Sequence, residues 1–335
     1  MRFAEVLFPF ADCTAYWWIP LAALLLEAVI GDPPGWPHPV RAIGWLCDGA
    51  ESLGRRLIPS ERIAGVFGVC AVLCGTWVSV RLLLLFPFFI AAVIAVYLCF
   101  AGLALGQLLR EGTAAIILLE REDVESARAA IGMLVSRDVS RADRDALCRT
   151  LAETLAENVN DAFIAPFFWL VLGGPAGLWL YKAASTMDSM WGYPYEPWTR
   201  FGTAAARLDD ALAFIPARLT AALLYCSAFL GRRGNAPFAF RPWFARVATD
   251  ARTMKSPNAG WPMAACAWIH RAAMGGPAVY AGSVVQKPVL GPPGTVWTPA
   301  ALRELCENIR RTGILGALSL GGAGFVFHDL IHGLS

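Results

Sequence analysis

Long apolar runs alternate with short polar segments along the chain, and this pattern predicts its elements. Six runs approach the roughly 20 residues that a helix needs to cross a bilayer core. They cover residues 16–30, 63–80, 82–105, 163–184, 211–230 and 313–327. The second and third runs meet at Arg81, which predicts a tight transmembrane hairpin. We therefore expect an all-α fold, a polytopic integral membrane helical bundle that forms a single membrane domain over residues 1–335.

Two regions depart from this pattern. Residues 106–160 are polar with a helical period, and Leu118, Ala127, Ile131 and Leu134 form a plausible buried stripe. This segment predicts an extramembrane helical insert. Residues 232–312 are expected to form a polar loop region that carries the motif Ser-Pro-Asn-Ala-Gly.

The run 163–184 has broken-helix character. It carries Gly173, Gly174, Pro175 and Gly177 at its centre, and broken backbone at membrane depth is tolerated where it is buried in protein or lines a polar cavity. Arginine-rich loops at residues 55–62, 121–149 and 232–255 should be cytoplasmic by the positive-inside tendency. Simple counting of crossings then puts residues 185–210 on the opposite side, whereas a broken or re-entrant helix would keep them near the cytoplasmic face.

Composition narrows the function classes. The chain is 57% hydrophobic and 16% charged, against about 25% charged residues in ordinary soluble domains. A net charge of +2 without a basic stripe excludes a nucleic-acid partner and leaves the lipid bilayer as the expected surroundings. The sequence has no G-x-x-x-x-G-K-[ST] loop, and its nine cysteines form no C-x-x-C pair.

Polar residues gather in four places beside apolar runs. Glu153, Glu157 and Asp161 recur every four residues and so share one helix face. Such oxygen donors suit Mg²⁺, although a solvated acidic face has the same pattern. The segment 31–41 is stiffened by prolines and carries Asp32, His38 and Arg41, which helix capping alone leaves unexplained.

Two further clusters are rich in both charge signs. The segment 185–218 contains Asp188, Arg207, Asp209, Asp210 and Arg218, and Arg207 could pair with Asp210 on a helix. The second of these clusters lies in the segment 250–258 and contains Arg252, Lys255, Ser256 and Asn258. Basic and short polar side chains are what a phosphate requires, while ion pairing and a surface turn are the structural alternatives.

Seven motifs carry a family resemblance, in this order: GDPPGWPHPVRAIG, SRDVSRAD, LAENVNDAFIAPFFW, MDSMWGY, RFGTAAARLDD, IPARLTA and DARTMKSPNAGWP. Over residues 22–291 the chain resembles adenosylcobinamide-phosphate synthases, the CobD/CbiB membrane proteins of cobalamin biosynthesis. The resemblance implies that aminopropanol phosphate, or aminopropanol, is joined to a propionate carboxyl of adenosylcobyric acid while ATP is consumed. A carboxylate is a poor acceptor until it is phosphorylated, and this step requires Mg²⁺ and basic residues.

Together with the residue pattern, the resemblance implies three groups of site residues. The catalytic group comprises Asp32, His38, Arg41, Asp188, Asp209 and Asp210, with His38 or Asp210 as the base. The group that binds substrate or phosphate comprises Arg137, Arg207, Arg218, Arg252, Lys255, Ser256 and Asn258. The metal group comprises Glu157, Asn158 and Asp161, with Asp188 or Asp209 as a further ligand.

The resemblance also sets a location and partners. It implies a multi-pass protein of the cell (inner) membrane with its active site at the cytoplasmic face. Other cobalamin-biosynthesis proteins or a second copy of the chain are the expected protein partners. The chain departs from the usual family pattern at Ser185, Pro194, Tyr195, Ala213 and Met263, which bears on the choice of amine.

Two other function classes remain open at this point. Broken helices and intramembrane charges also line the paths of transporters, although the polar residues here crowd into loops. A non-catalytic sensory membrane protein of the same superfamily is the second alternative, and it predicts loss of the acidic clusters that this chain keeps.

Overall fold

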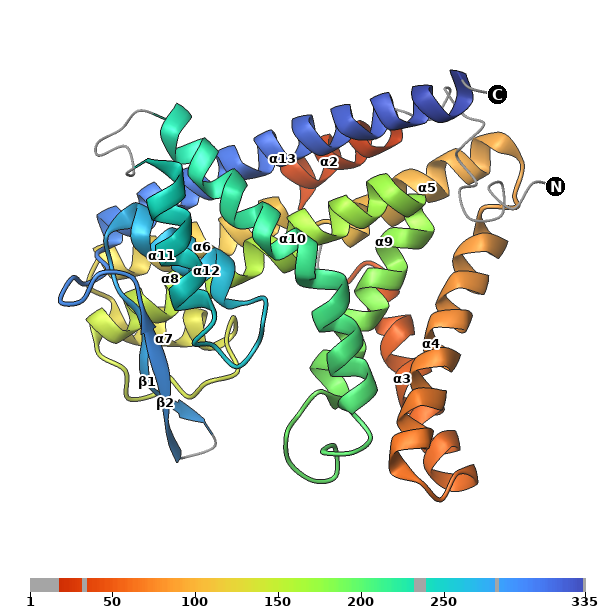
Figure 1. Ribbon diagram of the computed structural model, residues 1–335, viewed down its shortest axis with the longest axis horizontal. Helices are drawn as coiled ribbons and strands as arrows, with labels where there is room; N and C mark the ends of the chain where they lie inside the picture. Colours follow the sequence, from red (N-terminus) through yellow and green to blue (C-terminus); the bar gives the residue numbers. More distant parts are fainter. Residues whose placement is uncertain (1–17, 32–34, 232–238, 281–282, 334–335) are drawn as a thin grey trace. The chain divides into compact units, whose positions relative to one another are not determined.

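The computed structural model describes residues 18–31, 35–231, 239–280 and 283–333 (Figure 1). Helices dominate, and four helical stretches among these residues are long and apolar enough to cross a membrane: Glu61–Leu83, Phe88–Glu120, Arg144–Trp191 and Thr203–Leu230. This confirms the all-α, polytopic membrane class. Four of the six predicted runs lie in these stretches, whereas the first forms a helix of only 13 residues, Trp18–Ile30, and the last belongs to a long helix, Pro299–Gly333.

The chain divides into two compact units. Unit 1 comprises Met1–Ala104, Ala165–Ala213 and Ser319–Ser335, and unit 2 comprises Leu105–Ile164 and Phe214–Leu318. The predicted insert, residues 106–160, therefore belongs to unit 2 together with most of the region 232–312. Each unit has its own packing and its own candidate residues.

Unit 1 is a packed group of apolar helices. It contains α2 (Trp18–Ile30), α3 (Pro39–Leu57), α4 (Glu61–Leu83), α5 (Phe88–Gly102) and α9 (Ala165–Trp191), with the start of α10 (Thr203–Leu230) and the end of α13 (Pro299–Gly333). Helix α9 packs against α3, α4 and α5, and α2 packs against α5. Large apolar side chains on the outer faces of α4 and α5 are exposed, such as Leu82, Phe89 and Val93. Such faces suit contact with lipid.

Helix α9 is broken at its centre, as predicted. Gly174 adopts φ 60° and ψ −160°, a backbone region open almost only to glycine. Pro175 follows it and has no N–H to donate to the preceding turn. The two halves of α9 therefore meet at a break within an apolar stretch, where a regular helix would otherwise continue.

Unit 2 is built around a helical core with one hairpin. Its elements are α6 (Leu105–Glu120), α7 (Val124–Gly132), α8 (Arg144–Val159), the π-helix η2 (Asn160–Ile164), α11 (Phe240–Ala251) and α12 (Gly260–His270), with the remaining parts of α10 and α13. Ala127 and Ile131 are fully buried, and Leu118 and Leu134 pack against the same core. This confirms the predicted apolar stripe.

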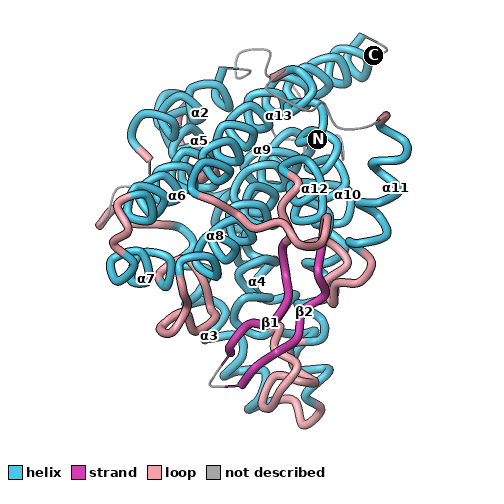
Figure 2. Tube along the Cα trace, turned by 90° about the vertical axis from the view of Figure 1, so that its left-hand side faces the viewer, coloured by secondary structure: helices cyan, strands magenta, loops and turns pink. Residues whose placement is uncertain are grey.

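The region 232–312 differs from the polar loop that the sequence predicted. Where it is described, it forms α11, α12, an antiparallel hairpin and the start of α13. Strands β1 (Met274–Tyr280) and β2 (Ser283–Leu290) lie side by side (Figures 1 and 2). The region is ordered because Trp243, Trp261 and Trp297 bury apolar area in the core of unit 2.

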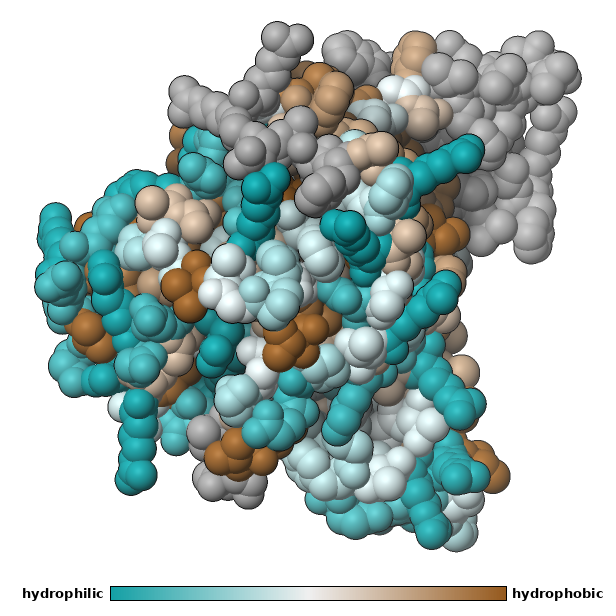
Figure 3. Space-filling model, turned by 60° about the vertical axis from the view of Figure 1, so that its left-hand side comes forward, coloured by the Kyte–Doolittle hydropathy of each residue, from teal (hydrophilic) through white to brown (hydrophobic). Residues whose placement is uncertain are grey.

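One face of the molecule is largely hydrophilic (Figure 3). On the face drawn in Figure 3, where the left-hand part of Figure 1 comes forward, many long hydrophilic side chains project and apolar groups are scattered among them. Scattered apolar side chains are normal on a water-facing surface. This face is therefore suited to water or lipid headgroups rather than to hydrocarbon.

Candidate functional site

Glu153 on α8 is fully buried and forms an ion pair with Arg137, which is largely buried. Arg137 Nη2 donates to Glu153 Oε2 at 2.5 Å, and the two side chains are 10% and 1% exposed. The other carboxylate oxygen, Oε1, accepts the backbone N–H of Gly275 at 2.7 Å. Gly275 has φ +87°, and a Cβ there would lie 1.9 Å from the carbonyl oxygen of Pro288. Glu153 therefore joins the segment before α8 to the hairpin.

One turn further along, Glu157 has different surroundings. It is half-buried and lies within electrostatic range of Asp161, Lys287 and Arg137. Asp161 belongs to η2, and its Oδ1 accepts from Asn160 Nδ2 at 2.7 Å. The hydroxyl of Thr220 on α10 lies 3.0 Å from Asn160 Oδ1. Two neighbouring carboxylates are thus held on α8 and η2, with basic residues close by.

This pair fits the way in which proteins hold Mg²⁺ with a phosphate substrate. In the described part of the chain, no three His, Cys, Asp or Glu side chains are grouped closely enough to hold a metal ion by themselves. Magnesium usually takes one or two carboxylates and fills its other positions with water and phosphate oxygens. Glu157 and Asp161 offer that donor set, whereas Glu153 is already engaged by Arg137 and Gly275. Asn158 lies beside them and is half-buried.

Arg218 on α10 holds the Ser-Pro-Asn-Ala-Gly loop in place. Its guanidinium donates to Asn258 Oδ1 at 2.8 Å and to the carbonyl oxygens of Phe214 and Pro257 at 2.8 and 3.2 Å. The same group lies 3.5 Å from the ring centroid of Phe214 and 4.7 Å from that of Trp261. Two predicted site residues, Arg218 and Asn258, are therefore brought together.

Ser256 shapes the same loop from within. Its hydroxyl accepts the backbone N–H groups of Asn258 at 3.2 Å and Ala259 at 3.3 Å, just before α12 begins. Arg252 and Lys255 lie in the same stretch and are exposed. Neither forms an ion pair with any residue that the structure describes. The loop therefore presents two cations on a backbone that Ser256, Asn258 and Arg218 fix.

In unit 1, His38 caps α3. Its Nδ1 accepts the backbone N–H of Val40 at 3.2 Å, and its ring lies edge-on to Trp179 with centroids 6.4 Å apart. A neutral imidazole that accepts at Nδ1 carries its proton on Nε2. Arg41 is exposed on the first turn of α3. Asp32 lies outside the described residues.

The remaining acidic candidates lie at the end of α9 and the start of α10. Asp188, Asp209 and Asp210 are half-buried, whereas Arg207 is exposed. The predicted pair of Arg207 with Asp210 is not formed, because Arg207 has no ion-pair partner among the residues that the structure describes. Asp209 and Asp210 are adjacent on a helix, so their side chains point about 100° apart and serve different surroundings.

The predicted residues are thus divided between the two units. Unit 1 carries His38, Arg41, Asp188, Arg207, Asp209 and Asp210, and unit 2 carries Arg137, Glu157, Asn158, Asp161, Arg218, Arg252, Lys255, Ser256 and Asn258. Within unit 2, Glu157 lies in electrostatic range of Asp161 and Arg137, and Arg218 is hydrogen-bonded to Asn258.

Lys287 is the residue of this site that sequence reasoning missed. It lies on β2 opposite Gly276, next to the glycine whose N–H binds Glu153, and it is half-buried. The hairpin register therefore brings its ammonium group toward Glu157. The available signal was a lone lysine between apolar residues in the stretch Val284–Leu290, but only a hairpin assignment would have connected it to α8.

Comparisons with known proteins converge on one family. The family model for CobD/Cbib protein matches residues 20–309. A relative from Pelobacter propionicus named "Cobalamin biosynthesis protein CobD" is 39% identical over 81% of this chain and 84% of its own length. Relatives of the same name from Klebsiella pneumoniae and Listeria monocytogenes are 36% and 31% identical, over 89% and 86% of this chain and 93% and 91% of their own lengths. No solved structure matches the chain.

Proposed function

Since the chain belongs to the CobD/CbiB family of cobalamin biosynthesis proteins, we propose that it is a ligase that forms a carbon–nitrogen bond. In this proposal it joins aminopropanol phosphate, or aminopropanol, to a propionate carboxyl of adenosylcobyric acid with consumption of ATP. The product is adenosylcobinamide phosphate when the phosphorylated amine is used. The protein acts as a multi-pass protein of the cell membrane, with its site at the cytoplasmic face.

The observation that supports this proposal best is the arrangement around Glu157 and Asp161. The carboxylate of Glu157 lies in electrostatic range of Asp161, Lys287 and Arg137. Carboxylates for a metal ion and cations for phosphate oxygens are what phosphoryl transfer requires, because it proceeds through positioning and charge stabilisation.

Glu157 and Asp161 would hold Mg²⁺ in this proposal, with Asn158 as the third member. The bound ion would neutralise the phosphates of ATP, which in turn would supply the phosphoryl group that makes the substrate carboxyl a better acceptor. Lys287 and Arg137 would bind oxygens of the transferred group. Arg218 and Asn258 position the loop on which Arg252 and Lys255 would bind the phosphate of the amine.

The attacking amine must lose a proton, and His38 or Asp210 is the expected base for this step. His38 uses Nδ1 to accept the N–H of Val40, and its neutral ring therefore carries a proton on Nε2. It could accept a second proton only by giving up the cap of α3. Asp210 is a half-buried carboxylate, and a carboxylate can act as a general base.

The direct test is a reaction with purified protein in detergent. Adenosylcobyric acid, aminopropanol phosphate, ATP and Mg²⁺ are incubated with the protein, and the amide product is measured by mass. We expect Glu157→Gln and Asp161→Asn to reduce the rate by roughly a hundredfold or more. Asp145→Asn is the matched control, because Asp145 is exposed on the same helix.

Two results would overturn the proposal. The first is the absence of product from protein that is folded by size-exclusion chromatography and thermal unfolding, combined with corrinoid flux in liposomes, which would indicate a transporter. The second is equal activity of the Glu157→Gln and Asp145→Asn variants. That result would leave the carboxylate pair without a role in the reaction.

A further inference from the structure

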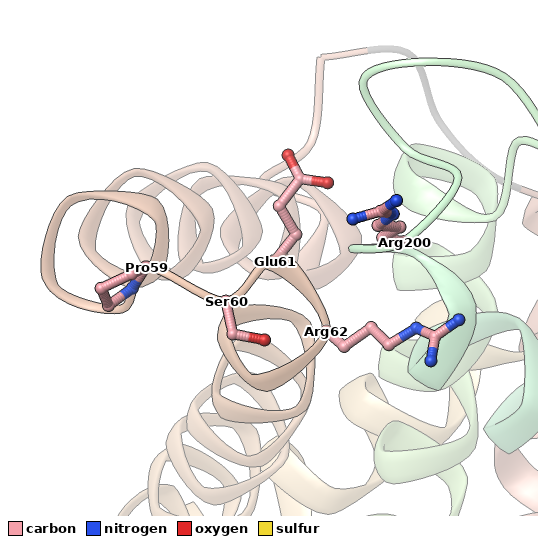
Figure 4. Close-up of a pocket in the computed structure, with 5 residues that line it drawn as sticks. All are labelled: Pro59, Ser60, Glu61, Arg62 and Arg200. Carbon is pink, nitrogen blue, oxygen red and sulfur yellow. The ribbon is translucent and has the colours of Figure 1, made fainter.

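A small hollow lies in unit 1 at the start of α4, apart from the residues considered so far. It has a volume of about 380 Å³ and is lined by Pro59, Ser60, Glu61, Arg62 and Arg200. The first four residues form the turn between α3 and α4 and the first turn of α4, and Arg200 comes from the loop after α9 (Figure 4). Two segments distant in the sequence therefore build it.

The charge in this hollow is positive. Neither Arg62 nor Arg200 has an ion pair or a hydrogen bond with any residue that the structure describes. Arg55 is shared between the carboxylates of Glu51 and Glu61, at 2.9 and 3.1 Å, so Arg55, Arg62 and Arg200 together exceed the two glutamates by one positive charge. In Figure 4 the Glu61 carboxylate and the Arg62 guanidinium extend in different directions from the start of α4. The hollow therefore has one net positive charge that favours an anion, and both Arg62 and Arg200 line it.

Arg55 makes the wall of the hollow rigid. Besides Glu61 it binds Glu51 Oε1 at 2.9 Å and the carbonyl oxygen of Pro197 at 3.0 Å. Its guanidinium also lies 4.4 Å from the ring centroid of Phe201. These contacts fix the backbone on both sides of Arg200 to α3 and α4. Fixed positions reduce the entropy lost when an anion binds.

The surroundings of the hollow indicate where the anion comes from. Helix α4 is one of the stretches able to cross a membrane, and it begins at Glu61. The apolar side chains of Leu57, Ile63 and Val66 are 64%, 61% and 52% exposed beside the arginines. Exposed apolar side chains next to cations at the end of a membrane helix match a lipid, with its acyl chains beside its phosphate.

We propose that Arg62 and Arg200 bind the phosphate group of an anionic phospholipid at the end of α4. Arginine is suited to this role because its planar guanidinium donates two parallel hydrogen bonds to phosphate oxygens. The bound lipid would tie the loop after α9 to the start of α4 at the membrane surface. This role is separate from the proposed ligase reaction and does not depend on it.

Native mass spectrometry tests the proposal on the whole protein in detergent with added phosphatidylglycerol or phosphatidylcholine. We expect the protein to retain phosphatidylglycerol in preference to phosphatidylcholine. The Arg62→Gln/Arg200→Gln variant should bind phosphatidylglycerol roughly thirtyfold more weakly, given the usual contribution of two basic side chains at an anionic surface. Arg62→Lys/Arg200→Lys keeps both charges and should retain most of the binding.

Arg56→Gln is the matched control for Arg62→Gln, because Arg56 is also exposed and lies on the last turn of α3 without lining the hollow. If the two single variants lose equal affinity for phosphatidylglycerol, the lipid responds to general surface charge, and the proposal is wrong. Equal retention of both lipids would do the same. If inorganic phosphate or glycerol phosphate displaces the lipid at equal concentration, the site binds a soluble phosphate and the lipid assignment is wrong.

Discussion

At the scale of single residues, two glutamates one helical turn apart have distinct surroundings. Glu153 is fully buried between Arg137 and the N–H of Gly275, and both of its oxygens have donors. Glu157 is half-buried beside a second carboxylate, with Lys287 at the same side. The periodic spacing that relates the two residues in the sequence therefore does not give them the same role. One connects elements of unit 2, and the other is available for a metal ion or a phosphate.

Glu153→Gln should destabilise the protein without any change in its substrates. The variant keeps a side-chain oxygen for Gly275 but removes the charge that pairs with Arg137, and loss of one charge from a buried ion pair costs about 3 kcal/mol. Glu157→Gln should change the free energy of unfolding by less than about 1 kcal/mol, since it removes repulsion from Asp161 as well as attraction. Denaturation followed in detergent measures both values, and equal destabilisation by the two variants would contradict this division.

His270 predicts a pH dependence of stability. Burial lowers the pKa of His270 to about 4 from its usual value of 6.5. Its ring lies 5.6 Å from that of Trp297, and its Nε2 lies 3.5 Å from Asn308 Nδ2. Between these two pH values the unfolded chain binds a proton and the folded chain does not. The free energy of unfolding should therefore fall as the pH is lowered from about 6.5 to 4, by at most about 3 kcal/mol.

Thermal unfolding of wild type and His270→Gln at a series of pH values measures this contribution. The variant lacks the titrating ring, so its unfolding midpoint should depend less steeply on pH within the window. Above pH 7 the difference between the two proteins should be constant, because the histidine is neutral in both states. Parallel curves from pH 7.5 to 4.5 would contradict the assignment to His270.

At the scale of elements, the break in α9 is the feature that the sequence predicted best. The break depends on a single backbone conformation at Gly174, which other residues adopt at a cost of about 1–3 kcal/mol. Gly174→Ala should therefore lower the free energy of unfolding by about that amount. Gly173→Ala is the control, because no atom lies within 4 Å of its added Cβ and its backbone is not strained.

The thermal midpoints of these two variants in detergent separate the effect of the break from that of glycine in general. Gly173→Ala should be neutral or slightly stabilising, since alanine favours a helix more than glycine does. If Gly174→Ala unfolds at the same temperature as Gly173→Ala, the break is not a fixed part of the fold.

Other elements could not be predicted from local pattern. The residues of the hairpin β1–β2 fall within the region 232–312, which the sequence predicts as a polar loop. Its order comes from Glu153, which binds Gly275 from a distant helix. Likewise, the sequence predicts Arg218 and Asn258 as site residues but does not predict their hydrogen bond. That bond forms because α10 packs on the loop before α12. Local pattern predicts which residues are unusual, and tertiary contacts decide which of them meet.

At the scale of the whole molecule, the structure bears on the side of the membrane at which residues 185–210 lie. Counting crossings places them opposite the loop that carries Arg55, Arg56 and Arg62. Within unit 1, however, Arg55 binds the carbonyl oxygen of Pro197, and Arg200 lines the same hollow as Arg62. The loop after α9 therefore lies at the same end of α4 as the arginine-rich loop. This favours a broken or re-entrant path for the apolar run that contains Gly174.

Cysteine accessibility tests this path. In a background without native cysteines, single cysteines replace the exposed residues Arg56, Thr199 and Leu85. A membrane-impermeant maleimide should label Leu85→Cys in spheroplasts, because the turn 84–87 lies at the other end of α4 from the arginines. Arg56→Cys and Thr199→Cys should be labelled only in inside-out vesicles, since basic loops stay in the cytoplasm. Labelling of Thr199→Cys from the outside together with Arg56→Cys from the inside would contradict the contact of Arg55 with Pro197 and require α9 to cross fully.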